Sequence, residues 1–378
     1  MRLHRTTPFA SFASFAVLSL VGCQSQLDVR TIDIDLPPCP IAGAEPADHL
    51  IQDDEKHFKH LWKLTSGGEN AEGYFNPAGD RLSFQRTTEE SGCDEIFVTD
   101  TAGGYRVISS GKGTTTCSYF MPDGKSVLYG STQAKHEDCP PRPDMTQGYT
   151  WAIYPEYDIY VQDLETGEER LLVGGEGYDA EATVSPRGDR IVFTSTRSGD
   201  IELWTCDLAG GDLKQVTDAP GYDGGAFFSH DGEWLVFRTT AFTPGKEAEE
   251  IADFEHLRDM GLVRPGAMEV MICRADGSER RRITNLGEAN WAPYFFPNDK
   301  RIIFSSNHDW PGAGPINFDL WAIDLDGKNL ERITTYDDGV GRNFDAFPMF
   351  SPDGRYLVFG SNRGGAQGET NLFIAEWQ

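Results

Sequence analysis

The stretch SPRGDRIVFTSTRSGD, residues 185–200, decides the fold, because nearly the same phrase returns as SPDGRYLVFGSNRGG at residues 351–365. Self-similarity of this kind is typical of repeat architectures. In both phrases a Pro presets φ for a tight turn, a Gly supplies a positive φ, and an aliphatic–aromatic strand follows. Six related turns, four with both residues and two with only one of them, occur in the chain: NPAGD (76–80), MPDGK (121–125), SPRGD (185–189), SHDGE (229–233), FPNDK (296–300) and SPDGR (351–355).

Each turn begins a similar set of strands. In the third copy the strand after the turn contains Val192-Phe193, the next contains Leu203-Trp204, and a last one ends in Val216-Thr217. Four-stranded units of about 40–45 residues predict the blades of a β-propeller. The sixth copy lacks its outermost strand, and residues 62–65, which resemble the other outer strands, can supply it. We therefore expect an all-β, six-bladed propeller of four-stranded antiparallel blades, closed by an N-terminal strand that completes the last blade.

The N-terminus has the features of an exported, lipid-anchored protein. A positive start and a short apolar run precede Cys23, and the run is too short to span a membrane. This pattern resembles the lipobox of bacterial lipoproteins. The resemblance implies a signal peptide over 1–22, lipidation of Cys23, and an outer-membrane location facing the periplasm. The alternative is an ordinary cleaved signal peptide. We expect residues 23–60, which are polar and rich in Pro, to form a tether, and 61–378 to form the propeller.

The charge of the chain limits its partners. With 33 basic and 60 acidic residues, the formal net charge is −27. A nucleic-acid partner is excluded, because phosphate contacts need a basic surface, and direct binding to an anionic membrane surface is disfavoured. Cations or basic peptides suit such a chain.

The repeated turn–strand–SxR/N–strand–DG pattern resembles the TolB-type, or PD40, propeller repeats of bacterial envelope proteins, over about residues 61–378. The chain differs from TolB itself, because only a tether precedes the predicted ring, where TolB carries an α/β domain. The stretches GYDGGAFF (221–228), LVRPGAMEV (262–270) and ETNLFIAEW (369–377) are similar to an uncharacterised lipoprotein subgroup of these proteins. The resemblance implies the fold, but it implies no particular activity.

Two columns of residues are predicted to surround the mouth of the propeller channel. The residue seven positions before the second turn residue is polar in every copy, and the residue five positions before it adds two carboxylates. Such a ring suits a divalent cation such as calcium, or a peptide bearing Lys or Arg. The alternative is that these side chains only satisfy local backbone groups. The first column is Asn70, Thr115, Asp179, Asp223, Asn290 and Asp345; the second contributes Glu72 and Glu181.

Long insertions are predicted on the same face, at residues 131–157 and 240–267. The second contains an amphipathic helix over about 246–260, with Ile251, Phe254 and Leu257 at helical spacing. Long loops in a compact fold are often functional, although they can also simply cover apolar surface. Aromatic and imidazole side chains expected at this mouth are Trp291, Phe344, His308 and Trp310.

Five of the six cysteines outside the lipobox fall into two groups. Cys206 and Cys273 occupy the same position of two blades and are predicted to be buried core residues. Cys93, Cys117 and Cys139 map to the elaborated face, and in an exported chain one disulfide is expected among them, without an indication of which two pair. His136 near Cys139 is a weaker hint of zinc.

Known catalytic motifs are missing from the sequence: it has no G-x-S-x-G, no H-E-x-x-H and no phosphate-binding loop. We therefore predict a scaffold that binds an envelope protein or peptide at its acidic, loop-rich mouth. The alternative is a metal-assisted glycan lyase or hydrolase, in which a His would contribute to the metal site.

Overall fold

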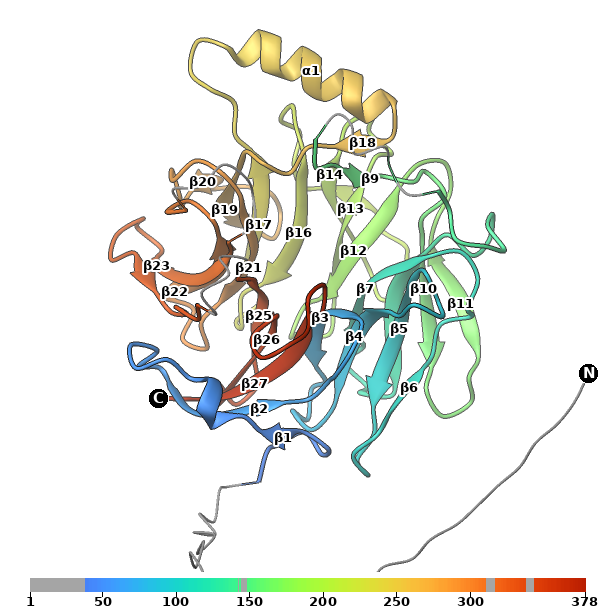
Figure 1. The fold of residues 1–378 in the computed structure, drawn as a ribbon. Coiled ribbons are helices and arrows are strands. Elements are labelled where there is room, and N and C mark those ends of the chain that lie inside the picture. Colours follow the sequence, from blue (N-terminus) through green and yellow to red (C-terminus); the bar gives the residue numbers. More distant parts are fainter. Residues whose placement is uncertain (1–37, 142, 144–147, 311–316, 338–342) are drawn as a thin grey trace, which may run out of the picture. The chain divides into compact units, whose positions relative to one another are not determined.

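The computed structural model describes residues 38–378, except residues 142, 144–147, 311–316 and 338–342. From Cys39 to Gln378 the chain forms one compact unit. Six of its sheets are the blades of a six-bladed β-propeller, as the repeat predicts (Figure 1). The aliphatic–aromatic pairs of the repeat form its core; Val192, Phe193 and Leu203, for example, are fully buried.

The first three blades each contain four antiparallel strands. Blade one consists of β3 (Glu69–Phe75), β4 (Leu82–Thr87), β5 (Asp94–Thr99) and β6 (Tyr105–Val107). Blade two consists of β7 (Thr115–Phe120), β8 (Ser126–Ser131), β10 (Asp158–Asp163) and β11 (Glu169–Val173). Blade three consists of β12 (Asp179–Val184), β13 (Ile191–Ser195), β14 (Glu202–Cys206) and β15 (Lys214–Gln215).

The last three blades follow the same plan, and the last includes strands from both ends of the unit. Blade four consists of β16 (Asp223–Phe228), β17 (Trp234–Thr240), β19 (Met268–Arg274) and β20 (Arg281–Arg282). Blade five consists of β21 (Asn290–Phe295), β22 (Arg301–Ser306), β23 (Asp319–Asp324) and β24 (Glu331–Arg332). Blade six consists of β25 (Asp345–Phe350), β26 (Tyr356–Ser361), β27 (Asn371–Trp377), β2 (Phe58–Lys63) and β1 (Glu45–Pro46).

A β-bulge interrupts the innermost strand of every blade at the same place. In blade three the pairing between β12 and β13 shifts between Ala180 and Thr183, and the other five blades show the equivalent shift. A bulge of this kind redirects one side chain. The residues with positive φ at these bulges are Glu72, Cys117, Glu181, Gly225, Ala292 and Phe347, which is the second column of the sequence analysis.

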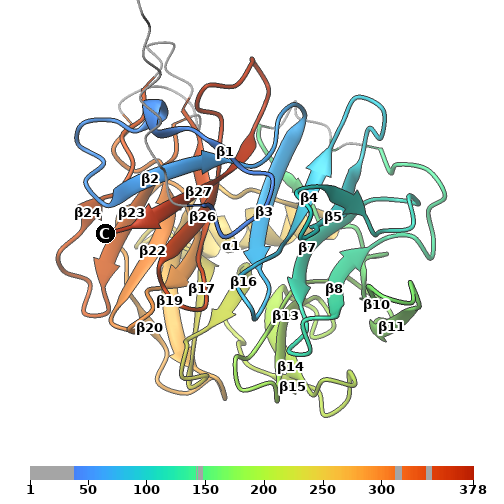
Figure 2. The same ribbon diagram turned by 90° about the horizontal axis from the view of Figure 1, so that it is seen from below.

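The N-terminal strand closes the ring, and residues before it also pack on the propeller, which differs from the predicted tether. Strand β2 pairs with β27 and begins at Phe58 (Figure 2). The part of the predicted tether from residue 39 to residue 60 is instead packed on blade six, where it forms β1, a 3-10 turn (Asp48–Leu50) and the start of β2. Ile41 and Ala47 are buried there.

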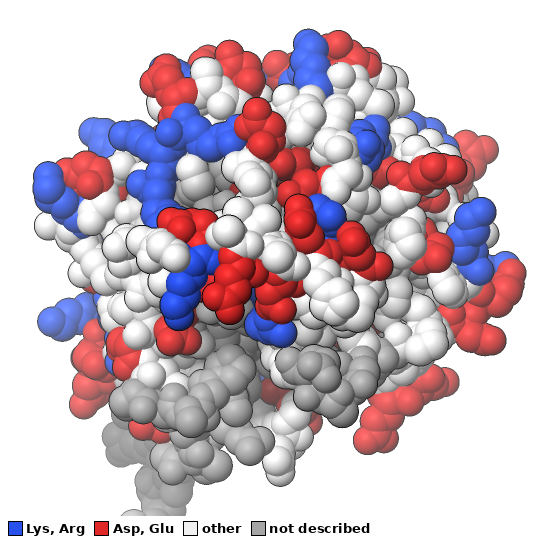
Figure 3. Space-filling view, turned by 90° about the horizontal axis from the view of Figure 1, so that it is seen from above, with Lys and Arg blue, Asp and Glu red and all other residues white. Residues whose placement is uncertain are grey.

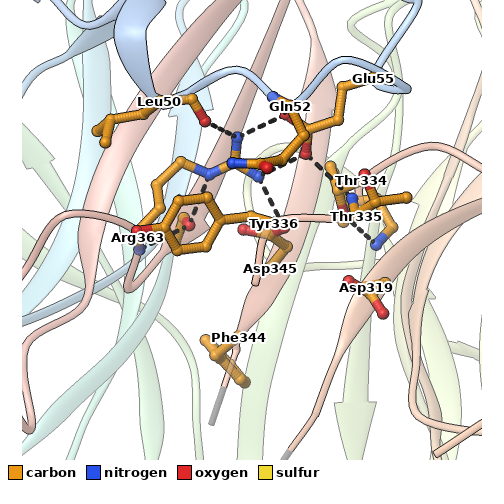
Figure 4. Close-up of polar contacts among 12 residues, drawn as sticks. Leu50, Gln52, Glu55, Asp319, Thr334, Thr335, Tyr336, Phe344, Asp345 and Arg363 are labelled. Atoms are coloured by element: carbon orange, nitrogen blue, oxygen red, sulfur yellow. Dashed lines mark hydrogen bonds and ion pairs between the residues drawn. The ribbon is translucent and has the colours of Figure 1, made fainter. Parts of the chain in front are cut away.

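A buried ion-pair cluster explains this packing. Arg363, after β26, is fully buried, and its guanidinium contacts both carboxylate oxygens of Glu55 at 3.1 Å and Oδ2 of Asp345 at 2.8 Å (Figure 4). The ring of Tyr336 covers the guanidinium. Because an unpaired buried charge is costly, the N-terminal segment must stay packed to place Glu55 beside Arg363.

Candidate functional site

The first polar column lies at the start of the inner strands, as expected, but its side chains are buried and paired. Asp179 binds Arg197, and Asp345 binds Arg363, both at 2.8 Å. Nδ2 of Asn290 donates to backbone carbonyls. All six members are buried: Asn70, Thr115, Asp179, Asp223, Asn290 and Asp345. The column therefore ties strands and blades together, and it does not present a ring of open carboxylates.

A sequence signal for this pairing was present in the repeated phrase itself. Both TSTR (194–197) and GSNR (360–363) end in an Arg two residues after a Ser. The Nε atom of Arg197 donates to Ser195 Oγ at 2.8 Å, and that of Arg363 donates to Ser361 Oγ at 3.1 Å. The Ser orients the Arg toward the Asp that starts the same blade.

A second set of acidic side chains lies at or next to the start of the third strand of each blade, and the sequence analysis missed it. The set is Asp94, Asp158, Glu202, Glu269 and Asp319, with Asn371 in blade six. Parallel bridges between adjacent blades bring members of this set beside the first column of the next blade. Burial, with the nearby Asp223, raises the pKa of Glu202 to about 8. Burial, with the nearby Asp345, raises the pKa of Asp319 to about 7. The signal was an acid just before the aliphatic–aromatic pair of the third strand.

The second column points to the propeller axis, where it lines a small cavity. This cavity has a volume of about 20 Å³, enough for about one water molecule. Its lining includes all six bulge residues together with Arg238.

Arg238, on β17, is held at the axis by an ion pair with Glu181. The Tyr222 hydroxyl donates to Glu181 Oε2 at 2.5 Å and accepts from Arg238 Nη2 at 2.7 Å. The adjacent glycines Gly224 and Gly225 of the GYDGGAFF stretch make room for this cluster. A Cβ on Gly225 would lie 2.4 Å from Arg238 Nη1, and one on Gly224 would lie 2.5 Å from the Tyr222 hydroxyl.

Glu72 and Cys117 complete the polar part of the cavity. Burial raises the pKa of Glu72 to about 7, and the nearby Glu181 adds to the effect, while a hydrogen bond with Cys117 opposes it. The Oε2 atom of Glu72 is buried without a hydrogen-bond partner. Burial and the two carboxylates raise the pKa of Cys117 well above its usual range. Cys117 is therefore a neutral thiol at neutral pH and is not activated as a nucleophile.

Aromatic rings close the axis below this cavity. Tyr74 and Phe227 pack edge to face with centroids 5.3 Å apart, and Phe227 and Tyr294 pack in the same way at 5.2 Å. Tyr119 packs against Tyr74 at 5.9 Å. These rings fill the axis, so a polypeptide cannot pass through it.

The two long insertions meet over the mouth. Strand β9 (Trp151–Ala152) of the first pairs with β18 (Leu262–Val263) of the second, and α1 (Glu247–Asp259) lies above them (Figure 1). The predicted helix is confirmed, with Phe254 and Leu257 buried. The Cζ atom of Arg238 lies 4.9 Å from the centroid of the Trp151 ring, which stacks over the guanidinium. The insertions therefore cover the axial cluster.

The other predicted mouth residues lie in this region with structural partners. Trp291 is buried, stacks on Phe318 at 4.3 Å and donates from Nε1 to the carbonyl of Pro265. Phe344 packs edge-on against Phe318. His308 packs against Trp321 with centroids 4.4 Å apart, and burial lowers its pKa. Trp310 is half-buried, and its backbone N–H donates to the carbonyl of Asn307.

A larger pocket lies on the same face, between blades one and two. We call it the acidic groove, because it has a volume of about 670 Å³ and five carboxylate residues in its lining: Glu90, Asp94, Glu95, Glu137 and Asp138. Arg86 and Lys112 are its basic residues, and Lys112 pairs with Glu137. Burial and the charge of Glu90 raise the pKa of Glu95.

The Cys93–Cys139 disulfide lines the acidic groove and links blade one to the first insertion. Cys117 remains a free thiol, and Cys206 and Cys273 are fully buried. Among the described residues, no group of three or more His, Cys, Asp or Glu side chains could hold a metal ion. His136 instead lies near Glu156. Within the same part of the chain, no helix is long and apolar enough to span a membrane.

Comparisons with known proteins support the fold. No family model matches the chain. An uncharacterized protein of Agrobacterium fabrum (strain C58) is 26% identical over 272 residues, which cover 71% of this chain and 62% of that protein. The match thus spans less than two thirds of the relative's length.

Solved structures with similar folds include a TolB candidate from Agrobacterium tumefaciens (TM-score 0.51, 17% identity, covering 82% of this chain and 91% of that one). The tricorn protease matches with a TM-score of 0.53 and 18% identity, covering 82% of this chain and 25% of that one. A gluconolactonase from Xanthomonas campestris matches with a TM-score of 0.53 and 14% identity, covering 90% and 98%. At these identities the likeness shows a shared TolB-like propeller fold and nothing about activity.

Proposed function

We propose that this protein is a binding module of the cell envelope, and that its acidic groove recognises a basic segment of a partner protein. The observation that carries the proposal is the unbalanced charge of the groove. Five carboxylate residues line it against two basic ones, and two of the carboxylates, Glu90 and Glu95, repel each other. A Lys or Arg side chain of a partner would relieve this repulsion, and acidic clefts also attract cationic partners over a distance.

The surroundings of the groove support a role in recognising a protein. The axis is filled by aromatic rings, so the outer face must supply the contact surface. Helix α1 adds exposed carboxylates to that face, and Figure 3 shows several groups of acidic side chains there, with basic ones between them. The exposed acids of the helix are Glu247, Glu249, Asp253, Glu255 and Asp259.

The location is part of the same proposal. Lipidation of Cys23 would anchor the protein in the envelope, on the periplasmic side of the outer membrane, by acyl chains that hold it durably. Cys23 lies outside the described residues. The anchor would keep the acidic face within reach of periplasmic partners.

A direct test compares binding of fluorescent peptides by anisotropy. We expect Lys/Arg-rich peptides to bind the purified protein, with an affinity that falls as salt is added, and acidic peptides of the same length not to bind. The variant Glu90→Gln/Glu95→Gln/Asp138→Asn should weaken binding. A matched control, Glu165→Gln/Glu168→Gln/Glu233→Gln, also removes three charges from exposed acids, all outside the groove, and should bind like the wild type.

Photo-crosslinking in cells then identifies the partner. A photoreactive residue at position 90 or 138 should capture one envelope protein through a basic segment, whereas the same residue at position 165 should not. Equal loss of peptide binding in the groove and control variants would show only a general charge effect and would refute the groove as the binding site.

A further inference from the structure

The tripeptide Asn-Phe-Asp occurs twice, at residues 317–319 and 343–345, and the structure places the two copies side by side. Phe318 and Phe344 form a parallel bridge between blades five and six: the Phe318 N–H donates to the carbonyl of Asn343 at 3.0 Å, and the Asp345 N–H donates to the carbonyl of Phe318 at 2.8 Å. Side chains alternate along extended strands. The two Phe rings therefore share one face, against Trp291, and the Asn and Asp side chains share the other.

The Asn and Asp side chains of this second face are buried, yet three of their oxygens lack partners. Asp319 is fully buried, and Asp345 and Asn343 are 1% and 4% exposed. Oδ2 of Asp319 accepts from Arg332 at 2.5 Å and from Asn317, and Oδ2 of Asp345 accepts from Arg363. The Oδ1 atoms of Asp319, Asn343 and Asp345 have no hydrogen-bond partner. Buried acceptors without a partner are uncommon and need an explanation.

The charge of this cluster also calls for a cation. Three buried carboxyl groups (Glu55, Asp319 and Asp345) share two guanidinium groups (Arg332 and Arg363), and the half-exposed Arg332 also contacts Asp309, so acidic groups outnumber basic ones here. Figure 4 shows Asp319 and Asp345 below the Arg363 cluster. Only oxygen atoms are available as ligands, a set that suits hard cations and not zinc or copper.

We propose that a divalent cation, Ca²⁺, binds between blades five and six on the Oδ1 atoms of Asp319, Asn343 and Asp345. Water molecules would complete its coordination, as they do in many Ca²⁺ sites. The ion would join the two blades next to the point where the N-terminal segment closes the ring. With two neutralising Arg side chains nearby, the site is expected to be weak, with a Kd of about 10⁻⁴–10⁻³ M, as in extracellular modules. This inference is independent of the proposed peptide binding.

The equivalent junction between blades three and four provides a matched control. There the bridge joins Ile201 and Tyr222, and Glu202 and Asp223 are the acidic pair. Gly221 stands in the position of Asn343, so this junction lacks the amide oxygen. Glu202→Gln therefore removes a carboxylate from an acid pair without touching the proposed ligands.

The test is a titration of CaCl₂ into the EDTA-treated mature protein, followed by calorimetry and by thermal unfolding. We expect one equivalent of Ca²⁺ to bind and a saturable rise in Tm. Asp319→Asn and Asn343→Ala should each weaken binding at least about 10-fold, and Glu202→Gln should leave it unchanged. Asn343→Ala keeps every ion pair of the cluster, so it tests the site even if Asp319→Asn folds poorly.

Three results would overturn the proposal. The first is no binding heat and no change in Tm with Ca²⁺. A shared proton or a water molecule between the two carboxylates would then explain the unpartnered oxygens. The second is binding that survives both Asp319→Asn and Asn343→Ala, which would mean an adventitious ion elsewhere. The third is an equal rise in Tm with NaCl at matched ionic strength, which would show no preference for a divalent ion.

Discussion

Replacing Gly225 by Ala should test whether the axial cluster is a tightly fitted unit. The new Cβ would lie 2.4 Å from Nη1 and 2.8 Å from Cζ of Arg238. Because a carbon atom does not approach other atoms that closely, the guanidinium must move, and we expect this to break its contacts with Glu181 and Tyr222. Breaking a buried ion pair costs about 3–5 kcal/mol, and the left-handed backbone of Ala costs about 1–2 kcal/mol. We expect Gly225→Ala to lower the free energy of unfolding by roughly 4 kcal/mol or more.

A double-mutant cycle separates the two contributions. In an Arg238→Met background the colliding atoms are gone, so Gly225→Ala should cost only about 1–2 kcal/mol, the backbone part. Ala292→Gly is a matched control, because Ala292 occupies the same bulge position in blade five with a φ of 47°. Urea unfolding followed by Trp fluorescence measures all four variants, and Trp151, over Arg238, lies at the perturbed site. An equal cost of Gly225→Ala in both backgrounds would refute the collision.

Three further predictions concern other parts of the molecule. Glu55→Ala should destabilise the protein by about 3–5 kcal/mol, because Arg363 then keeps only one carboxylate partner in a fully buried place; an unchanged Tm would contradict this. Glu72 has a folded-state pKa of about 7 against an ordinary value of 4.5, so its contribution to stability is fully present below pH 4.5 and is lost as the pH rises through about 7. Melting curves from pH 4 to 8 should therefore show a smaller decline for Glu72→Gln than for the wild type, and parallel curves would refute the assignment. Cleaving the Cys93–Cys139 disulfide, which spans 46 residues, should cost about 4 kcal/mol on the loop-entropy model, and Cys93→Ser should melt at the same temperature with and without dithiothreitol.

The propeller could be predicted because every blade repeats a local signal. A turn with Pro, Gly or both, followed by an aliphatic–aromatic strand, marks each inner hairpin, and the length of the unit then indicates the architecture. The packing of residues 39–60 could not be predicted in the same way. These residues carry no repeat, and their order depends on Arg363, which binds Glu55 across a sequence separation of 308 residues.

The sequence analysis predicted where the mouth residues lie, but it did not predict that their side chains are buried and paired. Counting back from the turns found the residues that begin the inner strands, and the structure places them there. Their exposure depends on partners from other strands, such as Arg197 for Asp179. Counting back from the turns also treated both columns as mouth residues, although the first column joins the blades and the second faces the axis. Only the bulge in each inner strand, with its positive φ, distinguishes the two columns.

The axial column shows how departures from the repeat can be interpreted. In each blade the bulge residue of the inner strand lies near the residue that follows the aromatic residue of the second strand. Arranged by blade, these pairs are Glu72 and Gln85, Cys117 and Gly130, Glu181 and Thr194, Gly225 and Arg238, Ala292 and Ser305, and Phe347 and Gly360. In two blades a large member is paired with glycine, Gly225 with Arg238 and Phe347 with Gly360, whereas in blade one both Glu72 and Gln85 are long.

A glycine opposite Arg238 and another opposite Phe347 provide the space that these two large side chains need near the axis. Blade four differs from the other blades, because Arg238 is the only charged residue among the second members of the pairs. The insertions cover this same residue, through Trp151. Blade four has a glycine at a position where the other blades carry a side chain, and it has an Arg where they carry a small or neutral residue. The sequence contains this signal. It becomes readable once the pairing of the two strands is known, and it marks blade four as the place where this propeller departs most from its own repeat.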